Sequence, residues 1–66
     1  MKVHVNGELK ELPDGATVAR LVEVLALGGT RVAVEVNKEL IVKKAWDAHV
    51  LKEGDRVEVV TFVGGG

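Results

Sequence analysis

The sequence has few side chains that could carry out chemistry. It has no cysteine, so it offers no thiol nucleophile, no thiolate ligand and no disulfide. His4 and His49 lie far apart, and neither has a second histidine at metal-ligand spacing. Asp14 and Asp55 each stand beside a glycine and are interpreted as turn residues. We therefore predict no catalytic constellation, no metal site and no cofactor of the chain's own.

The remaining reactive group is the carboxyl group of Gly66, which follows Gly64 and Gly65. A carboxylate is anionic at neutral pH and a poor electrophile, so it reacts only after activation, for example as an acyl adenylate made from ATP. Glycines keep such an end narrow, and three extended residues reach roughly 10 Å into an enclosed site. A frayed terminus or a leftover linker is the other interpretation of these glycines.

Composition limits the class of protein. The 66 residues carry a net charge of −1, and 47% of them are hydrophobic, which is enough for the core of one small domain. The sequence has no basic block of the kind that indicates nucleic-acid binding, and it has no apolar run long enough for a membrane span. The lack of cysteine fits a reducing compartment, so we expect a cytoplasmic protein. We predict one domain over residues 1–63 and a flexible glycine tail over residues 64–66.

Alternating apolar residues and turn signals predict five strands and one helix. Residues 2–5 and 8–12 flank Asn6-Gly7, the strongest short hairpin signal, because a type I′ turn needs positive φ at both positions. Thr17 is a good helix N-cap, and the helix that follows should stop at Gly28-Gly29. Its apolar stripe has helical spacing and consists of Val18, Leu21, Val22 and Leu25.

Three more strands are expected at residues 31–36, 39–42 and 56–63, with a tight turn at Asn37-Lys38. Residues 43–52 form a connection that carries Trp46, which we expect to be partly buried. One helix must then cover one face of one sheet. We predict an α+β protein with the β-grasp arrangement, in which a single mixed sheet of four to five strands packs on the helix and the first and last strands are parallel.

The last strand presents two different sides. Alternation places Val57, Val59, Thr61 and Val63 on one side and Arg56, Glu58, Val60 and Phe62 on the other. If the first side faces the helix, Val60 and Phe62 form an exposed docking patch beside the tail, with Val63 at its edge. A bulge near Val59-Val60 would instead turn Phe62 into the core. Both interpretations are open at this point.

Several segments together resemble the ThiS family of ubiquitin-like sulfur carriers. They are "VNG", "TVARLVEVL", "VAVEVN", "EGDRVEVV" and the closing "FVGGG", in the family's order and over the whole chain. The chain departs from the family in two places. Lys38 stands where a glycine is common, and Val42-Lys43 stands where a Pro-Arg pair is common. The Lys43-Lys44 pair is expected to be solvated, with a contact at the rim of a partner as the alternative.

The resemblance implies a function for Gly66. A ThiF-like adenylyltransferase would use ATP to adenylate its carboxylate, and a sulfur donor such as a cysteine desulfurase or rhodanese-type protein would then leave a thiocarboxylate. That group would supply sulfur to a thiazole synthase (ThiG-like) in thiamine biosynthesis. The chain would be a co-substrate rather than an enzyme, monomeric when free, and would bind neither nucleic acid nor membranes. Three alternatives are a molybdopterin-synthase small-subunit-like carrier, a ubiquitin-like modifier conjugated through Gly66, and a plain binding module with an incidental tail.

Overall fold

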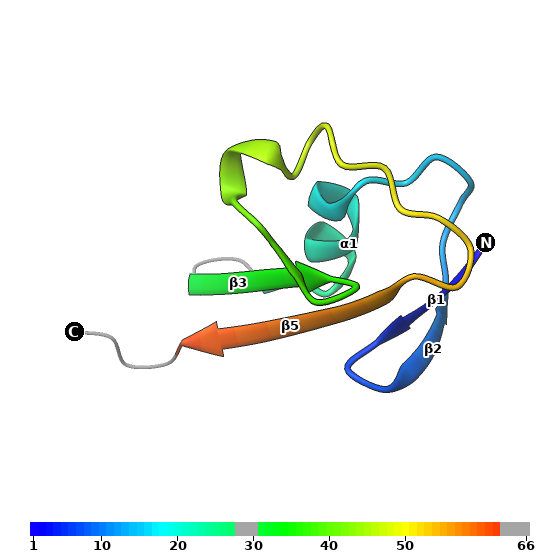
Figure 1. The fold of residues 1–66 in the computed structure, drawn as a ribbon, viewed down its shortest axis with the longest axis horizontal. Helices are drawn as coiled ribbons and strands as arrows, with labels where there is room; N and C mark the ends of the chain where they lie inside the picture. The colour runs from blue at the N-terminus through cyan, green and yellow to red at the C-terminus, as the bar shows by residue number, and fades with distance from the viewer. Residues whose placement is uncertain (28–30, 63–66) are drawn as a thin grey trace.

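A computed structural model describes residues 1–27 and 31–62. Five strands and one α-helix follow one another as β1 (Lys2–Val5), β2 (Glu8–Glu11), α1 (Val18–Val24), β3 (Arg31–Val36), β4 (Glu39–Ile41) and β5 (Arg56–Phe62), with a 3₁₀ helix, η1 (Lys43–Ala45), after β4. The strands form one sheet in the order β2-β1-β5-β3-β4. β1 and β5 are parallel, and the other pairs are antiparallel. The α+β fold with parallel first and last strands is therefore confirmed (Figure 1).

Both tight turns have the backbone that their sequences predict. Asn6 and Gly7 have φ of 51° and 84°, and Asn37 and Lys38 have φ of 51° and 71°. Positive φ at both central positions defines a type I′ turn, whose twist matches that of the two strands it joins. Lys38 takes this conformation with a side chain, at a position where a glycine would meet less steric cost.

The core lies between α1 and one face of the sheet. Alternate valines of β1, β3 and β5 point toward the helix, and Val3, Val34 and Val57 are essentially inaccessible to solvent. Val18 and Leu21 of α1 meet them with no exposed surface. The apolar residues that recur every two positions in the strands and at helical spacing in α1 thus form one apolar layer, as the sequence predicts. The opposite face of the sheet, turned away from α1, is called the open face below.

Helix α1 ends earlier than the glycines predict. It spans Val18–Val24, with Leu25 as its C-cap, and Ala26 has a φ of 55°. The prediction that Gly28-Gly29 stops the helix is therefore wrong: the chain leaves the helix before them, and residues 28–30 lie outside the described part. The turn at Ala26 lets Leu27 pack against the core, and this packing outweighs the cost of a left-handed alanine. In the described residues, neither helix has the length and apolar character to cross a membrane.

The connection between β4 and β5 closes the N-terminal end of α1. The amide of Val18 donates to the carbonyl of His49 at 3.0 Å, and that of Ala19 donates to the carbonyl of Trp46 at 3.2 Å. Thr17 caps the helix as predicted, since its Oγ1 accepts from the amide of Arg20 at 3.2 Å. Trp46 is half-buried and donates from Nε1 to the carbonyl of Ile41 at 2.9 Å, which confirms its packing role.

Candidate functional site

The last three described residues of β5 are exposed. Val57 and Val59 face the helix and are buried, whereas Val60 and Phe62 lie on the open face and each residue is 53% exposed. The register with β3 runs without a break from Val36 opposite Val57 to Arg31 opposite Phe62. A bulge would show as two residues opposite one, so the interpretation of Phe62 as a core residue is wrong.

The exposed apolar residues at this end of β5 form a continuous surface with β3. Val60 lies opposite Ala33, and cross-strand partners share a face, so these two side chains are neighbours. Phe62 lies opposite Arg31, which places a cation at the border of the surface. Ala33, Val60 and Phe62 are called the apolar patch below. Thr61 faces the helix side but is also exposed, so the end of β5 is accessible from both faces.

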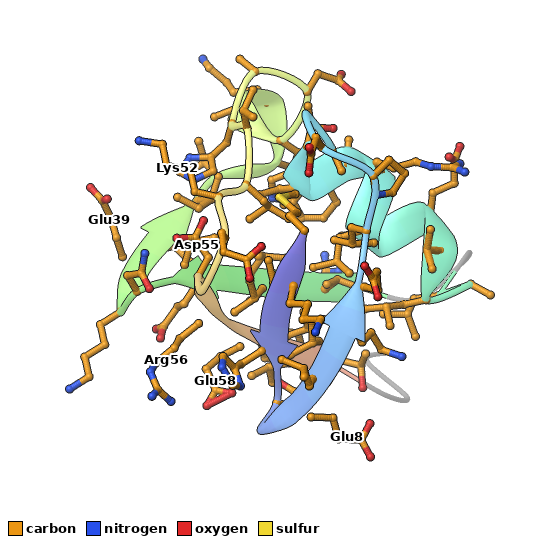
Figure 2. The ribbon with its side chains drawn as sticks, turned by 90° about the vertical axis from the view of Figure 1, so that its right-hand side faces the viewer. Glu8, Glu39, Lys52, Asp55, Arg56 and Glu58 are labelled. Atoms are coloured by element: carbon orange, nitrogen blue, oxygen red, sulfur yellow. The ribbon has the colours of Figure 1, made fainter. Side chains whose placement is uncertain are left out.

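The open face is charged where β5 begins. Arg56 and Glu58 point away from the helix (Figure 2), and Glu35 lies directly opposite Glu58. With His4 and Lys38 they line an open groove of about 580 Å³. Because both signs of charge meet there, the groove selects no single class of ionic ligand. The face thus changes along β5 from charged to apolar in the direction of the chain's end.

Polar bonds anchor the start of β5. Asp55 Oδ2 accepts from the amide of Lys52 at 2.8 Å, and Asp55 Oδ1 accepts from Asn37 Nδ2 at 3.0 Å. Figure 2 shows Asp55 and Arg56 beside the turn between β3 and β4. The role of Asp55 as a turn residue is therefore confirmed. The binding of asparagine side chains to β5 is a feature that the sequence analysis missed, and the repeated V-x-V-N pattern of "VHVN" and "VEVN" is the signal that could have revealed it.

The predicted site residues divide into two groups. The structure brings Val60 and Phe62 together on the open face, next to the point where the described chain ends. Val63 and the predicted tail of Gly64, Gly65 and Gly66 lie outside the described residues. In residues 1–27 and 31–62, no three histidine, aspartate or glutamate side chains gather in a way that could hold a metal ion.

Comparison with known proteins assigns the chain to a group. The model of the ThiS family matches residues 3–66. A thiazole synthase of Magnetococcus marinus is 42% identical over all 66 residues, and one of Paramagnetospirillum magneticum is 36% identical; the chain spans 20% of the length of each. The sulfur carrier protein ThiS of Escherichia coli is 24% identical, with both chains covered completely.

A solved structure supports the same assignment. The crystal structure of the thiamine biosynthesis protein ThiS from Geobacter metallireducens superposes with a TM-score of 0.83 at 35% sequence identity. The match covers 100% of both chains. The five-stranded sheet with one helix is therefore an arrangement found in a protein of that name and length.

Proposed function

This chain belongs to the ThiS family, and on that basis we propose that it is a sulfur carrier protein of thiamine biosynthesis. The observation that carries the proposal is the family match over residues 3–66, which extends through the glycine run. The full-length likeness to a sulfur carrier of Escherichia coli and the thiazole synthases among its relatives support the same pathway. In this proposal the chain is a co-substrate rather than an enzyme.

The proposed chemistry takes place on the carboxylate of Gly66. One carboxylate oxygen attacks the α-phosphorus of ATP, and pyrophosphate leaves, so that the glycine becomes a mixed anhydride with AMP. The terminal sulfur of a persulfide on a donor such as a cysteine desulfurase or rhodanese-type protein then attacks the acyl carbon, and AMP leaves with the former carboxylate oxygen. A thiol reductant attacks the donor's cysteine sulfur in the resulting acyl disulfide, so that a new disulfide forms and the old S–S bond breaks with its electron pair on the acyl sulfur. The product is a thiocarboxylate, which transfers its sulfur to a thiazole synthase (ThiG-like).

The apolar patch is the proposed docking surface for the ThiF-like adenylyltransferase. It lies at the end of the described part of β5, and Val63 and the glycines follow it in the sequence. Aromatic residues, phenylalanine among them, are enriched at the cores of protein interfaces. Docking there would leave Gly64 and Gly65 to lead Gly66 into the active site of the partner. ATP belongs to that partner, and we propose no cofactor for this chain.

Two measurements test the proposed function. With the cognate adenylyltransferase, the chain should support ATP–pyrophosphate exchange, and with a sulfur donor its intact mass should rise by the exchange of one oxygen for sulfur. Deletion of Gly66 should abolish both and leave the denaturant melt unchanged. Asp47→Asn, a change at an exposed position in the β4–β5 connection, serves as the matched control and should behave as wild type. Unchanged exchange after deletion of Gly66 would refute the proposal.

A further inference from the structure

Two asparagines start the two tight turns, and each binds the main chain of β5. Asn37 accepts at Oδ1 from the main-chain amide of Arg56 at 3.0 Å, and the main-chain amide of Asn37 donates to the carbonyl of Arg56 at 2.7 Å. Asn6 accepts at Oδ1 from the amide of Val59 at 2.8 Å and donates from Nδ2 to the carbonyl of Val59 at 3.1 Å. The two residues thus hold opposite edges of β5, one at its first residue and one in its second half.

The carboxamide of Asn6 takes the place of a missing strand residue. The parallel ladder between β1 and β5 ends at Val5 opposite Val57, because the chain turns back at Asn6. Val59 is the next residue of β5 whose main-chain groups face β1, since these groups alternate between the two edges of a strand. An amide side chain offers one donor and one acceptor, as a peptide group does. It therefore continues the ladder by one step.

Beyond Val59, β5 has a neighbour on one side. Figure 1 shows β5 running past the β1–β2 hairpin alongside β3. Within the described residues, no group other than Asn6 bonds to the β1 side of β5 after Val57. Asn6 is thus the last point of attachment on this side before the apolar patch.

We infer that Asn6 is a positioning residue for the apolar patch. Without its carboxamide, the amide and carbonyl of Val59 lose their partners, and within the described residues β3 is the only strand still paired with the end of β5. The strand end then populates conformations in which Val60 and Phe62 are displaced. For a partner that binds only the extended form, the apparent dissociation constant equals the intrinsic one divided by the fraction of molecules that keep this form. Asn37 acts at the far end of β5 and has no such effect. This inference rests on the proposed function for its consequence in activity.

The experiment compares Asn6→Gly with Asn37→Gly. Glycine tolerates the positive φ at both turns, so each variant loses an amide without adding backbone strain. Each removes bonds to β5, so both should lose stability. In the adenylation assay, Asn6→Gly should raise KM for the carrier about tenfold with little change in kcat, whereas Asn37→Gly should leave KM within about twofold. An equal rise in KM for both variants, or none for Asn6→Gly, would overturn the inference.

A second readout does not depend on the proposed function. In the free protein, amide hydrogen exchange at Val59, Val60 and Phe62 should accelerate about tenfold or more in Asn6→Gly relative to wild type, after correction for global stability. The same amides should keep their protection in Asn37→Gly. If wild type is not adenylated at all, the proposed function fails, and this exchange pattern alone decides whether Asn6 positions the end of β5. Exchange that is the same in both variants would refute the positioning role.

Discussion

Replacing Phe62 with alanine tests the apolar patch as a docking surface. A phenylalanine side chain can bury about 150–250 Å², and 53% of Phe62 is exposed in the free chain. A partner could therefore cover roughly 100 Å² more of this ring, which at about 25 cal/mol per Å² is worth about 2.5 kcal/mol. The dissociation constant for the adenylyltransferase should rise roughly 60-fold in Phe62→Ala.

The same substitution should have a small effect on folding. Phe62 lies outside the core cluster and contacts solvent on the open face, so its loss should lower the free energy of unfolding by about 1 kcal/mol. Truncation of a buried phenylalanine would instead lower it by about 3–5 kcal/mol. A denaturant melt measures the change in the free energy of unfolding. A calorimetric titration with the adenylyltransferase measures the change in the dissociation constant.

Leu40→Ala provides the matched control. Leu40 lies opposite Glu35 on the same open face but on β4, away from the apolar patch, and it is exposed to a similar degree. Its truncation should leave the dissociation constant within about twofold. Equal weakening by both substitutions would show that binding is not centred on the patch. A loss of stability as large as that of a core residue in Phe62→Ala would contradict the assignment of the faces.

Three further substitutions test local parts of the fold by denaturant melts. Lys38→Gly should raise the free energy of unfolding by about 1 kcal/mol, because it removes a side chain from a left-handed turn position with φ of 71°. Lys38→Ala keeps the Cβ and should not raise the free energy of unfolding. An equal gain for both variants would refute the reasoning. Thr17→Ala should cost about 1 kcal/mol through loss of the N-cap to Arg20, and Thr17→Ser should recover most of it; no recovery would point to lost packing instead. Leu21→Ala should cost about 2–5 kcal/mol, since this side chain is fully buried, and a cost under about 1 kcal/mol would contradict its place in the core.

The sequence alone determined which segments form strands and the helix, and most of the residues at which they begin and end. Strands repeat every two residues, type I′ turns need positive φ, and a threonine at a helix start offers its hydroxyl to a nearby amide. Each of these signals acts within a few residues of the chain. For this reason the Asn6-Gly7 hairpin, the Thr17 cap and the exact span of the strand from Arg31 to Val36 could be predicted, and so could the alternation that separates Val59 from Val60.

Only the tertiary structure decided where helix α1 ends, which face of β5 carries Phe62, and what the asparagine side chains bind. Ala26 leaves the helix because Leu27 packs on the core, and Phe62 is exposed because its register with β3 has no bulge. Asn6 bonds to a residue 53 positions further along the chain. These outcomes depend on contacts between segments that are distant in sequence, and their free energies override local preferences that differ by only about 1 kcal/mol.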